Sequence, residues 1–185
     1  MSNLLAFPRP TVRDEVFVEA ASRLAGAAAI VTWRIDAPSG LLVRATSLLS
    51  TRPARVLFGV DKEEPGHDGL LQAETLALSL LSEADQDEAE RFGQGRPVHS
   101  RNGQGRFPAD RWRIDADQLP RLRAAAVHLS GVVDHRIDAG SHSLFVVRVE
   151  AAEVSGRAPL VSFDHGFRRL AAAADQIVHA GAVSA

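Results

Sequence analysis

The sequence predicts a mainly β protein with flanking helices, in which the strands form an antiparallel barrel. About seven short apolar runs follow one another, mostly without the helical crossovers that a doubly wound parallel sheet requires. The chain has 185 residues, of which 45% are hydrophobic, so it can bury one sizeable core. We therefore expect a single domain over residues 1–185, with a core at about residues 12–170 and an Ala-rich tail at residues 171–185.

A helix is expected first, from about Val12 to Ala25. Thr11 and Asp14 are interpreted as a capping box, and Gly26 follows as a stop signal. Apolar residues make one face of this helix, at Val16, Phe17, Ala20, Ala21 and Leu24.

Four strands are expected after this helix. The runs Ala27–Ile35 and Leu41–Ala45 predict a β-hairpin, with a five-residue loop at residues 36–40. Further apolar runs predict a third strand at Ala54–Val60 and a fourth at Thr75–Leu81.

A second helix follows the fourth strand. Ser82 and Asp85 form another capping box, and the helix runs through Phe92 to end at Gly93. Its first turn is acidic and Arg91 lies in its last turn, as the helix dipole favours at each end.

Residues 93–118 form a polar, Gly-rich loop whose length is typical of a lid or a partner surface. The tetrapeptide GQGR occurs at Gly93–Arg96 and Gly103–Arg106. Neither copy has both the preceding strand and the following helix of a phosphate-binding loop, so both are interpreted as flexible loop. Phe107 and Trp112 are interpreted as packing anchors rather than residues that stack on a substrate.

The last third of the chain returns to strands. They are expected at Ala124–Ile137, with a bulge at Gly131, at Leu144–Val154 and at Pro159–Phe163. The tail Leu170–Ala185 is Ala-rich and is expected to form surface or dimer packing.

Composition excludes several classes of protein. There is no Cys, which excludes disulfides, thiolate zinc sites and a thiol nucleophile. The net charge is only −2, so we expect neither nucleic acid nor a membrane surface as a partner. No apolar run approaches the roughly 18 residues of a membrane span, and residues 1–12 do not read as a signal peptide. We expect a soluble, cytoplasmic protein.

The histidines do not predict a metal site. His128, His135 and His142 are each seven residues apart, a spacing that alternates the face of a strand. The HExxH pattern of zinc enzymes and the GxSxG motif of serine hydrolases are both absent.

Two segments are candidates for ligand binding. In Gly140–Val149 a polar corner with His142 leads directly into an apolar strand, and the ring could face a flat ligand or simply cap the turn. The segment Arg44–Ser47 is interpreted as a strand end, where hydroxyls and free turn amides could hold a cofactor. The alternative is a helix N-cap at Ser47 or Ser50.

The order of these motifs resembles the flavin reductase-like, FMN-binding split-barrel family, which includes the reductase partners of two-component flavin monooxygenases. The resemblance covers about Phe17 to Leu170. It is carried by five segments in the family's order, namely Gly26–Thr32, Arg44–Leu48, Arg91–Gly93, Gly140–Phe145, and Pro159 and Leu160 with Gly166 and Phe167.

The chain departs from the family's pattern at several positions. Arg44 stands where a Thr is usual, Ser141 replaces an Asp, and the segment at residues 50–53 is shortened. The loop at residues 61–64 lacks the usual phosphate-binding hydroxyls, and its Glu63 and Glu64 would repel a phosphate. The cations that could compensate are Lys62, Arg44 and Arg52.

The resemblance implies an antiparallel split β-barrel and an NAD(P)H-dependent flavin reductase. Such an enzyme uses NADH or NADPH to supply reduced FMN or FAD to a separate oxygenase, and a homodimer is implied because the family's site usually forms between two subunits. The alternatives are a non-catalytic or divergent flavin-binding split barrel and a structural dimer without ligand. His142 would line the nicotinamide side as the catalytic residue. The cofactor-binding candidates are Arg44, Ala45, Thr46, Ser47, Ser50, Lys62, Phe92, Gly93 and Arg168.

Overall fold

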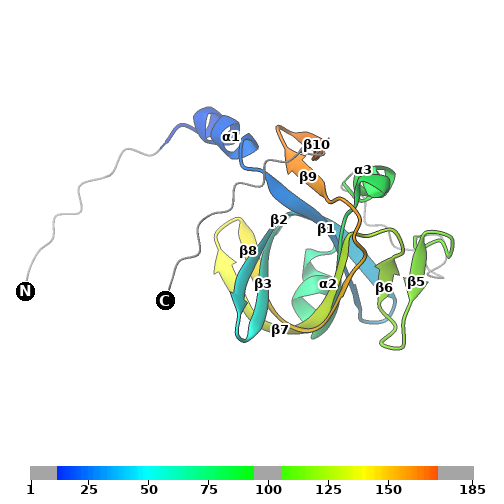
Figure 1. Ribbon diagram of the computed structural model, residues 1–185. Coiled ribbons are helices and arrows are strands. Elements are labelled where there is room, and N and C mark those ends of the chain that lie inside the picture. Colours follow the sequence, from blue (N-terminus) through cyan, green and yellow to red (C-terminus); the bar gives the residue numbers. More distant parts are fainter. Residues whose placement is uncertain (1–11, 94–105, 171–185) are drawn as a thin grey trace, which may run out of the picture.

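The computed structural model describes residues 12–93 and 106–170. Its centre is a closed ring of antiparallel strands in the order β1-β2-β3-β8-β7-β4, and β4 pairs again with β1 (Figure 1). The strands of the ring are β1 (Gly26–Arg34), β2 (Pro38–Thr51), β3 (Ala54–Asp61), β4 (Thr75–Leu80), β7 (Val127–Ala139) and β8 (His142–Val154). The antiparallel barrel expected from the sequence is confirmed.

The other elements lie around this barrel. The helices are α1 (Asp14–Ser22), α2 (His67–Gln72) and α3 (Gln86–Phe92), and a 3-10 turn at Glu83–Asp85 leads into α3. A separate hairpin consists of β5 (Trp112–Ile114) and β6 (Pro120–Leu122), while β9 (Leu160–Phe163) and β10 (Gly166–Arg169) extend the main sheet from the start of β1. No helix in the described part of the chain is long and apolar enough to cross a membrane.

Most of the predicted strands lie close to their expected ranges, but β2 is longer than predicted. Ser39 already pairs with Trp33, which shortens the hairpin loop, and the strand does not end at Ala45 but continues to Thr51. The extra length has a physical reason: the first part of β2 pairs with β1, whereas its last part pairs with β3.

Local signals predicted α3 correctly and missed α2. The capping box of Ser82 and Asp85 is confirmed, and Gly93 ends the helix. Helix α2 has only six residues, one of which is Gly69, so its sequence carries little helical signal. It forms because the fully buried Leu70 packs into the barrel interior. Strands β5, β6 and β10 were also not predicted.

Strand β1 is buried on both faces and separates two hydrophobic clusters. Ala29, Val31 and Trp33 belong to the cluster inside the barrel. Ala28 and Ile30 belong to a second cluster, which lies under α3 and the β5–β6 hairpin. Because neither face meets solvent, the strand is a continuous apolar run rather than an alternating one.

The second cluster contains the aromatic residues of the predicted loop. Phe107 and Trp112 are 5% and 1% exposed, and their ring centroids are 4.9 Å apart. Both pack against Phe92 of α3, which confirms them as packing anchors. Residues 94–105 and 171–185, which carry most of the GQGR repeats and the Ala-rich tail, lie outside the described residues.

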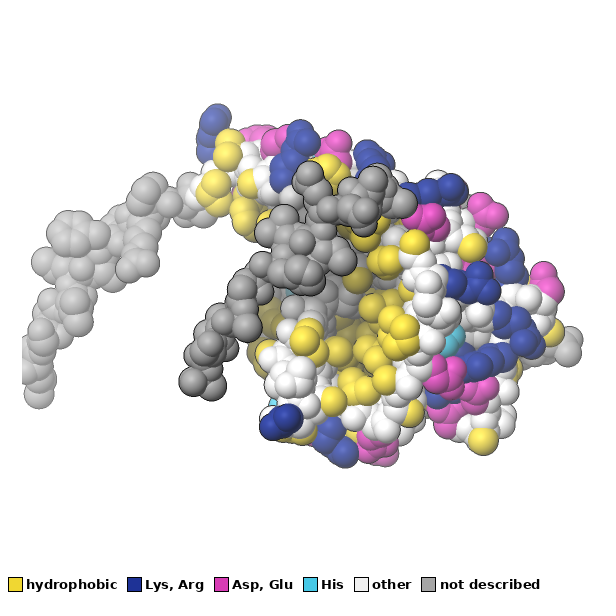
Figure 2. Space-filling view, viewed as in Figure 1, with side chains coloured by type: hydrophobic (Ala, Val, Ile, Leu, Met, Phe, Trp, Pro, Cys, Tyr) yellow, Lys and Arg dark blue, Asp and Glu magenta, His cyan; other side chains and the backbone are white. Residues whose placement is uncertain are grey.

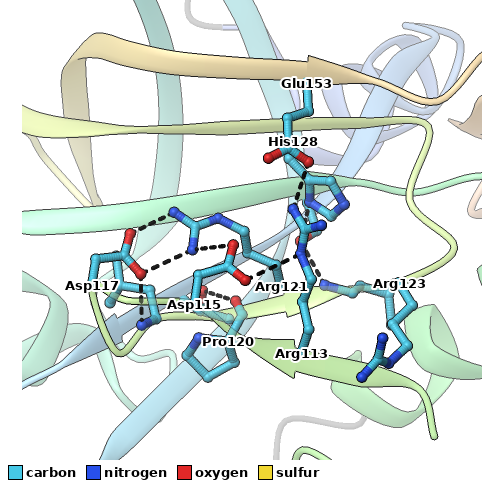
Figure 3. A network of polar contacts seen from close by, with 12 residues as sticks. Arg113, Asp115, Asp117, Pro120, Arg121, Arg123, His128 and Glu153 are labelled. Atoms are coloured by element: carbon cyan, nitrogen blue, oxygen red, sulfur yellow. Dashed lines mark hydrogen bonds and ion pairs between the residues drawn. The ribbon is translucent and has the colours of Figure 1, made fainter. Parts of the chain in front are cut away.

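A network of charged side chains ties the β5–β6 hairpin to the barrel (Figure 3). Arg121 of β6 is largely buried and pairs with Asp115 at 3.0 Å and with Asp117. Arg113 of β5 pairs with Glu153 of β8, next to the buried His128. The network therefore fixes the hairpin that covers the second cluster.

Helix α1 differs from the prediction in its cap and in its packing. The helix begins at Asp14, its N-cap is Arg13, and no side chain caps it, so the expected capping box is wrong. None of its residues is buried within this chain, and Phe17 and Leu24 are 60% and 77% exposed. In Figure 1 the helix lies outside the ring of strands, so the predicted apolar face has no partner in the described chain.

Strands β7 and β8 form a long ladder, with a bulge next to Gly131. Ser130 pairs with Ala151, but Gly131 pairs with Val149, so Glu150 is an extra residue on β8. The predicted bulge is therefore confirmed, although the additional residue lies on the partner strand.

Candidate functional site

A cleft of about 840 Å³ opens at one side of the barrel. Its walls come from the segment between α1 and β1, from β2, β3 and β8, from the end of α3, and from the turn between β9 and β10. Its volume lies within the range of small-molecule sites in proteins. In the view of Figure 2, apolar side chains of the described residues gather on one face of the molecule.

The structure brings together six of the residues predicted to bind or act on a ligand. The cleft is lined by Arg44, Thr46, Ser47, Phe92, Gly93 and His142. Ala45 lies in β2 between two of them, whereas Ser50, Lys62 and Arg168 are not among the lining residues.

The segment from Arg44 to Ser47 forms a bulge in the middle of a strand, and it is not a strand end. Ala27 pairs with Thr46 and Ala29 pairs with Val43, so two residues of β2 face one residue of β1. A bulge leaves its extra residue outside the ladder and turns a side chain away from the regular alternation. The prediction of turn amides after a strand end is therefore wrong, as is the alternative of a helix N-cap at Ser47 or Ser50, which both lie in β2.

Two neighbouring groups hold this bulge in place. The Thr46 hydroxyl donates a hydrogen bond to the Ala27 carbonyl at 2.8 Å, so that hydroxyl is already engaged within the protein. On β1, a Cβ added to Gly26 would lie 2.9 Å from the backbone oxygen of Arg44. Glycine is therefore required at position 26 because the two backbones approach closely.

The remaining predicted cofactor residues are engaged elsewhere. The Lys62 ammonium contacts both carboxylate oxygens of Asp138 at 2.9 Å, and this contact lowers the pKa of Asp138. The Ser50 hydroxyl donates to the Pro53 carbonyl, and Arg168 donates to the Phe167 carbonyl at 3.0 Å. The partner of Lys62 lies 76 residues further along the chain, so sequence reasoning could not identify it.

His142 lies at the start of β8, directly after the turn at Gly140, where φ is 75°. Its Nδ1 shares a hydrogen bond with the Ser141 hydroxyl at 2.9 Å, while the ring lines the cleft. His142 is thus bonded within the turn and also lines the candidate site, so its contact with a ligand stays a prediction. Across the ladder, His142 pairs with Asp61.

Of the carboxylates in the cleft, sequence reasoning identified Glu64 as a charge that would repel a phosphate, but it did not single out Asp61 or Asp164. Asp61, Glu64 and Asp164 all line the cleft. Burial raises the pKa of Glu64, and the negative charge of Asp61 adds to the rise. The acidic motif at residues 61–64 was visible, but only the fold shows which of its side chains face the cleft.

The β9–β10 turn was missed as well. Asp164 and His165 have φ of 51° and 58°, so both central residues of a two-residue hairpin loop are left-handed. Such turns favour Asn and Gly, and the Asp-His pair therefore gives a weak signal. The Asp164 amide donates to the Ser22 carbonyl at 2.8 Å, which holds this turn against the end of α1.

One further group of polar residues has the composition of a catalytic triad. His67 Nε2 lies 2.9 Å from the Ser143 hydroxyl, and His67 Nδ1 lies 3.4 Å from Asp68. Ser143 is only 5% exposed and does not line the cleft, so a substrate has no access to it here. The contact instead ties α2 to β8 beside His142. Among the described residues, no three His, Asp or Glu side chains could together hold a metal ion.

The cleft combines apolar walls with a few charged groups. Apolar strand residues contribute to its walls, the bulge in β2 lies along it, and Arg44 supplies a positive charge. Flavin and nicotinamide carry their own hydride chemistry, so a site for them requires groups that bind and orient the rings rather than a catalytic acid and base.

Comparisons with known proteins identify the family. A family model described as a flavin reductase like domain matches residues 21–171. An FMN reductase (NADH) of Methylorubrum extorquens, RutF 1, is 32% identical over 145 residues, which cover 77% of this chain and 69% of that protein. The NADH-dependent FAD reductase of Streptomyces globisporus is 27% identical over 150 residues, which cover 80% of each chain.

Solved structures have the same fold. BorF, the flavin reductase component of a bacterial two-component tryptophan halogenase, gives a TM-score of 0.77 at 25% identity and covers 85% of this chain and 98% of its own. The NADH:FAD oxidoreductase SgcE6 of Streptomyces globisporus C-1027, in complex with NAD and FAD fragments, gives 0.77 at 24% identity and covers 90% and 100%. Since the family model spans most of the sequence and the barrel and cleft agree with it, the chain belongs to the flavin reductase-like family.

Proposed function

We propose that this protein is an NADH-dependent flavin reductase that supplies reduced FMN or FAD to a separate monooxygenase. The observation that carries the proposal is the cleft of about 840 Å³, lined by six of the predicted site residues in a chain of this family. The relatives named FMN reductase (NADH) and NADH-dependent FAD reductase support NADH as the hydride donor and a flavin nucleotide as the acceptor. The halogenase reductase BorF supports an oxygenase as the consumer of the product.

The residues of this chain would position the reactants rather than move protons. Bound flavin and nicotinamide supply the hydride chemistry themselves, and the protein brings their rings together in a shielded site. The walls of β2, β3 and β8 would hold the flavin ring, and the ring of His142 would contact the nicotinamide side. Arg44 would offset negative charge on the ligands.

We further propose that a second copy of the chain completes the site. The exposed face of α1 carries Phe17, and the segment that follows it, including Leu24, lines the cleft. A second copy packed on α1 would remove this apolar surface from water and close the cleft at the same time. Sedimentation at micromolar concentration is expected to give twice the mass of 19.8 kDa. A monomer under these conditions would contradict the proposal.

The acidic residues of the cleft favour one alternative, a flavin-binding protein without reductase activity. Asp61 and Glu64 would raise the free energy of a bound nicotinamide nucleotide because its phosphates are negative. A spectrophotometric assay with NADH and free FMN, FAD or riboflavin separates the two functions. We expect steady NADH consumption. Flavin binding without NADH consumption would favour the alternative. A protein that neither binds flavin nor consumes NADH would exclude both functions.

Replacement of His142 by alanine should affect the nicotinamide more than the flavin. The apparent KM for NADH should rise roughly two- to tenfold, the equivalent of one lost hydrogen bond, with little change in the flavin dissociation constant. Steady-state kinetics and flavin fluorescence titration measure the two quantities. An equal loss of both would mean that His142 only maintains the corner.

A further inference from the structure

Arg44 is the one Lys or Arg side chain among the described residues that line the cleft. The other charged side chains there belong to Asp61, Glu64 and Asp164, and His142 and His165 are the titratable rings. A ligand that carries phosphate would therefore meet mostly negative charge, except where it reaches this guanidinium.

The local structure aims the Arg44 side chain and leaves it available. It extends from the β2 bulge and its guanidinium carbon lies 4.9 Å from the centre of the Phe167 ring, over which it packs. A Cβ on Gly93 would lie 3.3 Å from Arg44 Nη2, so the glycine at the end of α3 leaves room for the guanidinium. In the described chain no carboxylate forms an ion pair with Arg44.

We propose that Arg44 is the phosphoryl-binding residue of the cleft and that it makes this protein select phosphorylated nucleotides. The inference rests on the proposed function and makes its substrate class more specific. A guanidinium presents a rigid fork of donors that matches phosphate oxygens, and packing on Phe167 restricts its motion before a ligand binds. The phosphoryl group could belong to the flavin or to the nicotinamide dinucleotide.

FMN and riboflavin provide the direct test, because they share the isoalloxazine ring and differ in the phosphate. Fluorescence titration measures both dissociation constants without any catalytic turnover. We expect the full-length protein to bind FMN roughly ten- to hundredfold more tightly than riboflavin, the range for hydrogen bonds to charged groups. Arg44→Gln should bring this ratio close to one and leave riboflavin binding unchanged, while Arg44→Lys should retain part of it.

Arg169→Gln is the matched control. Arg169 lies on β10 near Phe167, is exposed, and does not line the cleft. The control should keep the ratio of the unmodified protein. If it lowers the ratio as much as Arg44→Gln does, net charge rather than a contact is responsible, and the assignment of Arg44 is overturned.

Kinetics with NADH distinguish the source of the phosphate. A rise in the KM for NADH in Arg44→Gln, with equal binding of FMN and riboflavin throughout, would assign the contact to the dinucleotide. If the unmodified protein binds flavin and Arg44→Gln changes neither the FMN-to-riboflavin ratio nor the KM for NADH, the inference about Arg44 is overturned while the proposed function stands. Failure of the unmodified protein to bind any flavin would overturn the proposed function as well.

Discussion

Replacement of Gly131 by alanine should destabilise the protein by about 4 kcal/mol or more, close to the loss of the fold. An added Cβ would lie 2.0 Å from the backbone oxygen of Arg148, and 3.0 Å from the Cα of Val149. These are backbone atoms of β8, so no side-chain rotation can relieve the overlap, and the bulge between β7 and β8 would have to come apart. Urea denaturation followed by circular dichroism measures the change in the free energy of unfolding.

Gly156→Ala is the control for this substitution. Gly156 has φ of 74°, and nothing lies within 4 Å of the position of its Cβ. Alanine there should lower the free energy of unfolding only by the cost of a left-handed backbone, about 1–2 kcal/mol. If Gly131→Ala cost no more than Gly156→Ala, the close approach of β8 to Gly131 would not exist in solution.

Replacement of Phe145 by alanine should cost about 3–5 kcal/mol. Phe145 of β8 and Phe58 of β3 are both fully buried, and their rings stack with centroids 5.2 Å apart. Alanine would leave a cavity inside the barrel and remove the stacked pair, and the closed ring of strands has little freedom to collapse into the space. The midpoint of urea unfolding should fall accordingly, with little change in its slope.

Val154→Ala, in the same strand, controls for loss of an apolar side chain from β8. Val154 is 78% exposed, so its replacement should change the free energy of unfolding by no more than about 0.5 kcal/mol. Similar losses at Phe145 and Val154 would contradict the arrangement of the interior cluster.

Elements whose signals are local were predictable, and elements that depend on distant contacts were not. The capping box of Ser82 and Asp85 lies within four residues and is present as predicted. Helix α2 depends instead on burial of Leu70 inside the barrel, which no local pattern of its six residues indicates. The apolar face predicted for α1 is exposed in the described structure, because periodicity does not say what covers a face.

The candidate site was predictable to a similar extent. Arg44, Gly93 and His142 come together from three parts of the chain, in agreement with the order of motifs that resembles the family. The bulge that aims Arg44 depends on pairing of β2 with β1, and the engagement of Lys62 depends on Asp138, so both required the fold. The cofactor roles of these residues stay predictions that the variants above can test.

The position of β1 between two hydrophobic clusters has a consequence for how the protein unfolds. One strand forms a wall of both interiors, so its displacement exposes apolar surface on each side at once. Neither half can then melt first and leave the other intact, which makes unfolding a single concerted event. Since Gly26 at the start of this strand lies close against the backbone of Arg44, the edge of the cleft at Arg44 should persist until the whole structure is lost.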